Sequence, residues 1–116
     1  MVPKSFNLTG VSHIPNAQEN IERYAKVGQT IQLVRDPTNP HDPFATKACI
    51  DIAGVPTQIG WIPMKFTSEV APFLDKGGKL HIQICDIVGG YHGYKWGVVV
   101  TIQSVEFPEA SNVVNR

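Results

Sequence analysis

The stretch LVRDPTNPHDPFATKA, residues 33–48, decides the fold, because it carries the chain out of one expected strand and into the next. Apolar residues lead up to Arg35. The nine residues 36–44 then hold three prolines, two aspartates, an asparagine and a histidine, and strand-like residues resume at Ala45. Proline fixes its own φ, removes a backbone donor and pushes the residue before it towards extended geometry. The sequence therefore predicts a loop here, between two strands.

This loop is expected to be stiff, since each of its three prolines directly follows an aspartate or an asparagine, in the pairs Asp36-Pro37, Asn39-Pro40 and Asp42-Pro43. Asp and Asn side chains also bond to their own backbone two residues further on. A stiff loop presents its polar side chains in nearly fixed directions, which suits a binding site. A tight connection that only joins two strands is the alternative. The side chains that the loop would present are Asn39, His41 and Asp42.

The composition indicates one globular domain. The chain has 116 residues, 42% of them apolar, and its ten basic and ten acidic side chains cancel, so no overall field recruits an anionic partner. We expect the domain to span residues 1–107, followed by a polar tail over 108–116. Cys49 and Cys85 stand singly inside apolar runs, which predicts core thiols in a reducing compartment. No long apolar run suggests a membrane span, and a cytoplasmic location is expected.

Periodicity predicts a mainly β protein with two helices. Asn16 and Glu19 resemble a capping box at the start of a short helix, and a second helix begins near Phe66 and continues past Pro72 to a Gly-Gly pair. A turn is expected at residues 54–56. No βαβ rhythm is present, so a small, mostly antiparallel six-stranded barrel with a helix against one side fits best. The six strands are expected at residues 4–14, 30–35, 45–53, 58–62, 79–88 and 97–107.

Several aromatic residues have expected places. Tyr24, Phe66 and Phe73 are predicted to be core residues, while Trp61 and Phe44 fit either the core or a recognition surface. Gly60 would let another backbone or a ligand approach its strand. The loop GGYHGYKW at residues 89–96 joins the last two strands and carries three aromatic rings.

In the order of these elements and in four motifs, the chain resembles the HIRAN domain. The motifs are GVSH at 10–13, LVRDPTNPHDPFA at 33–45, IGWIP at 59–63 and APFLDKG at 71–77. The family occurs at the front of some fork-remodelling helicase-like ATPases and as a stand-alone bacterial or phage protein. The resemblance implies an OB-like barrel that binds single-stranded DNA, with capture of a free 3′ end, in replication or repair. A replication or repair protein would be a further partner.

By position, the resemblance implies that Asp42 accepts the terminal 3′-hydroxyl, with His41 at an aromatic position and Asn39 at an amide position. His13 and Tyr94 fall at or near stacking positions. Ser12 stands where the DNA-end binders have Arg, and Met64 stands where they have a phosphate-binding Lys. An aspartate beside phosphates makes sense only as an acceptor for a hydroxyl donor. The expected DNA-binding residues are His13, Arg35, Asn39, His41, Asp42, Trp61, Lys65 and Tyr94.

Other readings stay open. Arg35 could pair with Asp36 on the surface instead of binding phosphate. The four histidines lack ligand spacing, so neither a metal nor another cofactor is expected. No nucleophile motif and no glycine-rich phosphate loop before a helix is present, which argues against an enzyme. The alternative function is a non-catalytic protein-interaction module that uses the aromatic loop from Tyr91 to Trp96 as its contact patch.

Overall fold

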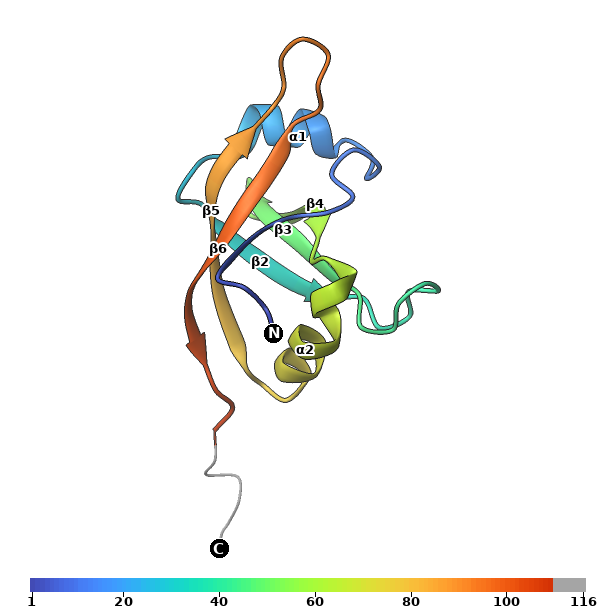
Figure 1. Ribbon diagram of the computed structural model, residues 1–116, viewed down its shortest axis with the longest axis vertical. Helices are drawn as coiled ribbons and strands as arrows, with labels where there is room; N and C mark the ends of the chain where they lie inside the picture. The colour runs from blue at the N-terminus through green and yellow to red at the C-terminus, as the bar shows by residue number, and fades with distance from the viewer. Residues whose placement is uncertain (110–116) are drawn as a thin grey trace, which may run out of the picture.

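A computed structural model describes residues 1–109, which form one curled antiparallel sheet of six strands with two helices (Figure 1). The strand order is β1-β6-β5-β2-β3-β4, and every pairing is antiparallel. The predicted mainly β fold is confirmed. Residues 110–116 of the expected tail lie outside the described residues. The elements are β1 (Ser5–Asn7), α1 (Ala17–Tyr24), β2 (Thr30–Arg35), β3 (Thr46–Ile52), β4 (Val55–Trp61), α2 (Met64–Asp75), β5 (Lys79–Val88) and β6 (Gly97–Glu106).

The sheet is not closed into a barrel, which corrects that part of the expectation. The chain just after edge strand β1 meets edge strand β4 through one isolated bridge, in which the Thr9 amide donates to the Trp61 carbonyl at 3.0 Å and the Trp61 amide donates back at 2.9 Å. Gly60 makes this approach possible, as its sequence position predicted. A Cβ at residue 60 would lie 2.9 Å from the Cβ of Leu8. The bridge holds the end of β4 beside the chain that follows β1.

The hairpin between β3 and β4 turns one residue earlier than expected. Ala53 and Gly54 both have positive φ, 52° and 84°, as a two-residue hairpin turn requires. Val55 then pairs with Ile52, so β4 begins at Val55 and includes Pro56. A proline is tolerated there because β4 is an edge strand and needs no ladder donor on its outer side.

The first strand is much shorter than the expected residues 4–14. Only Ser5–Asn7 form β1, because Gly10 adopts a φ of 72° and turns the chain. The amides of His13 and Ile14 both donate to the Gly10 carbonyl, at 3.0 and 3.2 Å. The end of the expected strand is therefore a turn that leads into α1.

The capping box predicted at the start of α1 is absent. Asn16 has a left-handed backbone, with φ 65° and ψ 3°, and its side chain makes no capping hydrogen bond. An N-cap side chain reaches the helix amides from the extended region of the backbone, so the sequence pattern alone is not sufficient. Tyr24 at the other end of α1 is 42% exposed, and its predicted place in the core is wrong.

In β5 a bulge explains why the inward-facing residues break strict alternation. Ile84 pairs with Val100 and Asp86 pairs with Val99, so Cys85 is an extra residue between two ladder pairs. Cys85 is exposed, contrary to the prediction, whereas Cys49 is buried as expected. The core lies between the curled sheet and the two helices. Its fully buried large residues include Ile21, Ile50, Ile59, Ile82, Ile84, Val98 and Val100.

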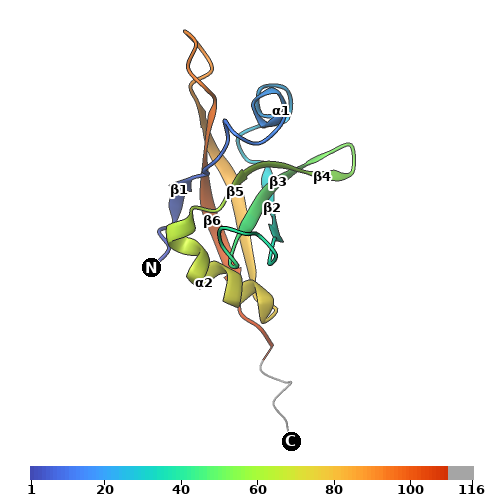
Figure 2. The same ribbon diagram turned by 90° about the vertical axis from the view of Figure 1, so that its right-hand side faces the viewer.

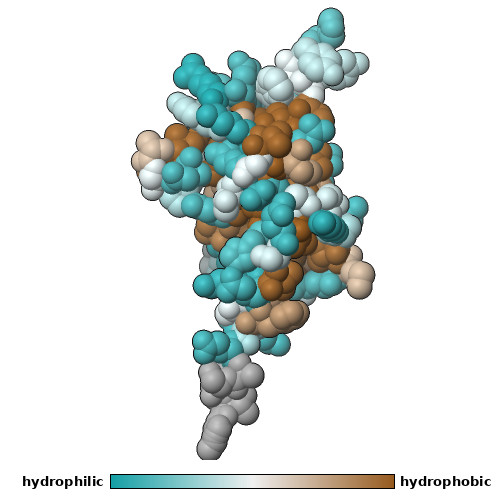
Figure 3. Space-filling model, turned by 90° about the vertical axis from the view of Figure 1, so that its left-hand side faces the viewer, coloured by the Kyte–Doolittle hydropathy of each residue, from teal (hydrophilic) through white to brown (hydrophobic). Residues whose placement is uncertain are grey.

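Helix α2 packs along one end of the sheet, as the second view shows (Figure 2). The ring centroids of Phe66 and Phe6 are 5.3 Å apart, which joins the helix to β1, and the helix continues through Pro72. On the face that is at the left in Figure 1, apolar and polar side chains are interspersed (Figure 3). Within residues 1–109, no helix is both long enough and apolar enough to cross a membrane.

Candidate functional site

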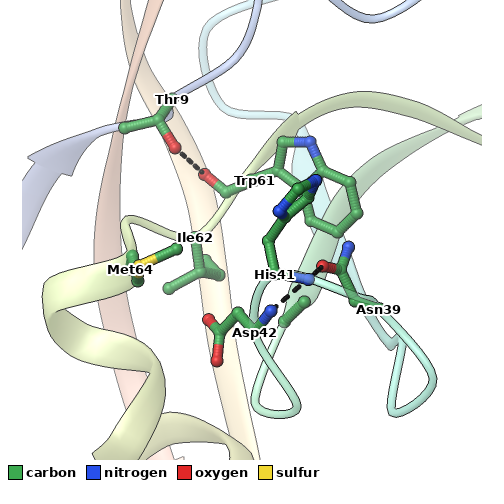
Figure 4. A pocket seen from close by; sticks show the side chains of 8 residues that line it. Thr9, Asn39, His41, Asp42, Trp61, Ile62 and Met64 are labelled. Atoms are coloured by element: carbon green, nitrogen blue, oxygen red, sulfur yellow. Dashed lines mark hydrogen bonds between the residues drawn. The ribbon is translucent and has the colours of Figure 1, made fainter.

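A pocket of about 260 Å³ lies between the proline-rich loop, the end of β4 and the start of α2 (Figure 4). We call the loop at residues 36–45 the proline loop and the cavity the Asp42 pocket. The structure brings four of the eight expected DNA-binding residues to this pocket. Its lining residues are Thr9, Asn39, His41, Asp42, Ala45, Trp61, Ile62 and Met64.

The proline loop is held by its own side chains. The Asn39 Oδ1 atom accepts hydrogen bonds from the amides of His41 and Asp42, at 2.9 and 3.1 Å. The Asn39 Nδ2 atom donates to the Asp36 carboxylate at 3.2 Å. The amide of Ala45 donates to the Asp42 carbonyl at 3.0 Å. The expectation that Asp and Asn side chains bond to the nearby backbone is therefore confirmed, and it explains how the loop keeps one shape.

The side chain of Arg35 links the end of the proline loop to helix α2. Its guanidinium donates to the carbonyl oxygens of Ala45 at 2.6 Å and Pro43 at 3.0 Å, and its Nε atom donates to the Asp75 carboxylate at 3.0 Å. The side chain is only 17% exposed. The alternative pairing of Arg35 with Asp36 is wrong, because Asp75 at the end of α2 takes that place. Arg35 thus joins both ends of the loop to the helix.

Asp42 is the charged group among the residues that line the pocket. Its Oδ1 atom accepts from the Phe44 amide at 2.9 Å, and its Oδ2 atom accepts from the Thr67 hydroxyl at 2.8 Å. A carboxylate has about four acceptor sites, so each oxygen keeps capacity for another donor. The Lys and Arg side chains of residues 1–109 do not line this pocket. Its chemistry favours a ligand that donates a hydrogen bond and carries no negative charge at that point.

Two rings accompany Asp42. The His41 imidazole and the Trp61 indole both line the pocket, one from the proline loop and the other from β4 (Figure 4). The backbone of Gly10 packs closely against the Trp61 ring, since a Cβ added at residue 10 would lie 2.7 Å from the Trp61 Cδ1 atom. Phe44 is 40% exposed, so it is no core residue, but it does not line the pocket. Flat rings beside an acceptor suit a base that stacks and a sugar that donates.

Cations lie beside the pocket rather than in it. Lys47 on β3 stands opposite Trp61 in the antiparallel ladder. Lys65 lies over the Phe66 ring, with its Nζ atom 5.2 Å from the centroid, and lines a neighbouring pocket of about 390 Å³. Thr9 lines both pockets, so the two cavities adjoin. This arrangement places two cations where anionic groups next to a ligand in the Asp42 pocket could contact them.

The structure does not bring His13 and Tyr94 to the pocket. His13 is exposed on the turn before α1, and Tyr94 is 73% exposed in the loop at residues 89–96. Figures 1 and 2 place that loop at the opposite end of the sheet from α2. Tyr94 instead lines a separate pocket with Glu19 and Glu22 of α1. The expected stacking residues therefore do not form one site.

Trp96 anchors the loop at residues 89–96 to α1 and is not one of the exposed residues of that loop. Its indole Nε1 atom donates to Glu22 at 3.2 Å, its amide donates to the Gln18 side chain at 2.7 Å, and it packs partly buried against the core. A Cβ at Gly90 would lie only 2.1 Å from the indole. The exposed rings of this loop are those of Tyr91, His92 and Tyr94.

Sequence reasoning missed two threonines of the site. Thr9 reaches the pocket only because of its bridge to Trp61, and Thr67 reaches Asp42 from the first turns of α2. Neither contact has a signal in the spacing of the chain, since each joins segments that are distant in sequence. In the described part of the chain, no three His, Cys, Asp or Glu side chains converge to form a metal site.

Comparison with protein families gives one result. Residues 4–92 match the family described as the HIRAN domain. No curated protein sequence and no solved structure matches the chain. The matched residues include the proline loop, β4 and α2, and thus every residue that lines the Asp42 pocket.

Proposed function

The chain belongs to the HIRAN domain family, a family of nucleic-acid-binding modules, and from this premise we propose that it binds single-stranded DNA by a free 3′ end. The terminal nucleotide occupies the Asp42 pocket. The observation that carries this proposal is the carboxylate of Asp42, which lines the pocket beside two rings.

A carboxylate repels phosphate, so it favours one part of a DNA strand over the others. An internal nucleotide offers the pocket phosphates on both sides, and a 3′-phosphate would place negative charge beside Asp42. A 3′-hydroxyl instead donates a hydrogen bond to the carboxylate, and bonds to charged acceptors are the stronger kind. The preference for a hydroxyl end follows from this difference.

Affinity comes mainly from the rings. The imidazole of His41 and the indole of Trp61 provide flat surfaces for the last bases, and stacking contributes about 1–3 kcal/mol per base regardless of sequence. Lys47 and Lys65 lie where they could contact the phosphates that precede the end. The bound strand would thus be held by stacking, a few phosphate contacts and one hydroxyl.

We further propose that the domain acts without catalysis, as an end-holding module within a replication or repair assembly in the cytoplasm. Holding an end in place requires only the contacts described above.

The two tryptophans allow a direct test, because they lie in different pockets. In the Trp96→Phe protein the indole fluorescence comes from Trp61, and we expect a short single-stranded oligonucleotide to quench it. In the Trp61→Phe protein the fluorescence comes from Trp96, and we expect no quenching at concentrations that bind a labelled oligonucleotide by anisotropy. Quenching of Trp96 alone would contradict the proposal and would indicate that the oligonucleotide binds near the loop at residues 89–96.

One observation favours the second candidate, a protein-interaction module. Tyr91 and Tyr94 are 66% and 73% exposed on the loop at residues 89–96, and large exposed rings that are grouped often mark contact surfaces. The contact patch would rest on these two tyrosines rather than on the anchored Trp96. A protein with both tyrosines changed to serine should lose a partner in a pull-down while keeping its oligonucleotide binding. Loss of oligonucleotide binding instead would show that the loop belongs to the DNA site.

A further inference from the structure

Thr67 is a buried hydroxyl whose main contact is the candidate end-reading carboxylate. Its side chain is 2% exposed, and its Oγ1 atom lies 2.8 Å from the Asp42 Oδ2 atom and 2.9 Å from the Met64 carbonyl. A threonine hydroxyl has one proton, so it donates to one of these acceptors at a time. The ionised carboxylate is the stronger acceptor, and we therefore assign the proton to the bond with Asp42.

We infer that Thr67 is a positioning residue that fixes the Asp42 carboxylate for recognition of a hydroxyl end. This inference rests on the proposed function and adds a determinant of specificity to it. The Phe44 amide holds Oδ1 and the Thr67 hydroxyl holds Oδ2, so the carboxylate is fixed at both oxygens. Each oxygen then keeps a free lone pair for an incoming donor.

The bond also connects two parts of the fold. Asp42 belongs to the proline loop, whereas Thr67 belongs to α2, and the contact joins the loop to the beginning of the helix. Arg35 and Asp75 join the same loop region to the end of the helix. The direction of the carboxylate is therefore set by the helix as well as by the loop. Loss of the hydroxyl would leave Oδ2 without its protein donor.

A purely structural role for Thr67 makes a different prediction. Threonine in a helix often donates to a carbonyl in the preceding turn, and Met64 offers such an acceptor. In that case, removal of the hydroxyl would change the stability of α2 but not the choice between two DNA ends. A positioning role instead changes the ratio of the two affinities, while stacking and phosphate contacts stay the same.

The test uses Thr67→Val, which keeps the shape, and Thr67→Ser, which keeps the hydroxyl. Dissociation constants are measured for one oligonucleotide with a 3′-hydroxyl and the same oligonucleotide with a 3′-phosphate. We expect Thr67→Val to reduce the preference for the hydroxyl end about threefold, because the hydrogen bond between Asp42 and the 3′-hydroxyl is weakened and not lost. Thr67→Ser, which keeps the hydroxyl, should keep the preference of the wild type. Melting temperatures of both proteins monitor the fold.

A second measurement on the ligand-free protein separates this inference from the proposed function. Three-bond NMR couplings at the Asp42 Cβ report whether the side chain keeps one χ1 rotamer. We expect one rotamer in the wild type and in Thr67→Ser, and averaging in Thr67→Val. An unchanged rotamer and an unchanged end preference in Thr67→Val would overturn the inference. A wild type without any end preference would overturn the proposed function, and the couplings would still decide whether Thr67 fixes Asp42.

Discussion

His41 and Asp42 are neighbours in the chain with different expected contributions to binding. The imidazole offers a surface to a base, so its contribution should not depend on the group at the 3′ end. We predict that His41→Ala weakens binding of hydroxyl and phosphate ends alike, by about 1–3 kcal/mol, the usual range for one stacked base. His41→Phe, which keeps a ring, is the control. The prediction fails if the alanine variant affects only one kind of end.

The two cysteines differ in reactivity for a structural reason. Burial raises the pKa of the Cys49 thiol, which disfavours the reactive thiolate, while Cys85 is exposed at the bulge in β5. We predict that one thiol per chain reacts rapidly with a disulfide reagent in the native protein and that both react in denaturant. Cys85→Ser should abolish the fast reaction. A fast phase that survives this change would place Cys49 within reach of solvent.

The raised pKa of Cys49 also has a consequence at alkaline pH. The neutral thiol is favoured in the folded protein, so stability is complete below the pKa of the unfolded chain and decreases as the pH rises through the higher folded value. A Cys49→Ala protein should lack this part of the alkaline destabilisation.

At the scale of elements, the proline loop and α2 act as one unit because Arg35 joins them. We predict that Arg35→Met lowers the free energy of unfolding by about 1.5–3 kcal/mol. The bonds from the charged donor to Asp75 and to the Pro43 and Ala45 carbonyls are lost, although the Ala45 carbonyl keeps the Asp36 amide as a donor. Arg35→Lys should not restore stability, because an ammonium cannot reproduce the fork of the guanidinium. Lys76→Met, at an exposed cation beside Asp75, is the control. Urea denaturation gives the values.

If Arg35 contacts a DNA phosphate instead, the effects of Arg35→Met on affinity and on stability would differ from this prediction. Affinity for oligonucleotides would then fall in Arg35→Met without a loss of stability, and the salt dependence would become shallower by about one phosphate contact.

The elements that sequence could predict are those with local signals. The proline loop followed from the backbone restrictions of its three prolines, and α2 followed from its apolar stripe. The capping pattern at Asn16 was misleading, because the backbone there is left-handed. The bulge at Cys85 could not be found from alternation, since its register depends on the pairing with β6.

For the site, the same limit applies to contacts between distant segments. Asn39, His41 and Asp42 could be predicted together because they share one loop. Thr67 could not be predicted, because its hydroxyl meets Asp42 only after α2 packs beside the loop.

For the whole molecule, zero net charge predicts a binding mode with little electrostatic contribution. Each phosphate contact on a single strand contributes about −0.7 to the slope of log K against log salt. With Lys47 and Lys65 as the contacts, we predict a slope of roughly −1.4. Lys65→Gln should make it shallower by about 0.7 at unchanged end preference, as anisotropy at several salt concentrations would show. A slope several times steeper would require a cationic surface elsewhere.

The loop at residues 89–96 and the proline loop lie apart in the ribbon (Figure 1), and the two pockets share no lining residue, so the two candidate surfaces can be altered independently. Tyr91 and Tyr94 can be changed without touching a residue of the Asp42 pocket, and pocket residues can be changed without touching the loop at residues 89–96. One domain could in this way hold a DNA end and a protein partner together.

The most direct measurement is an anisotropy titration of the wild type and Asp42→Asn with one labelled oligonucleotide that ends in a 3′-hydroxyl or a 3′-phosphate. We predict that the wild type prefers the hydroxyl end by about tenfold or more, in line with one hydrogen bond to a charged acceptor and relief of charge repulsion. Asp42→Asn should bind both ends with similar affinity. Equal affinity of the wild type for the two ends would contradict the proposal that Asp42 recognises a free 3′-hydroxyl.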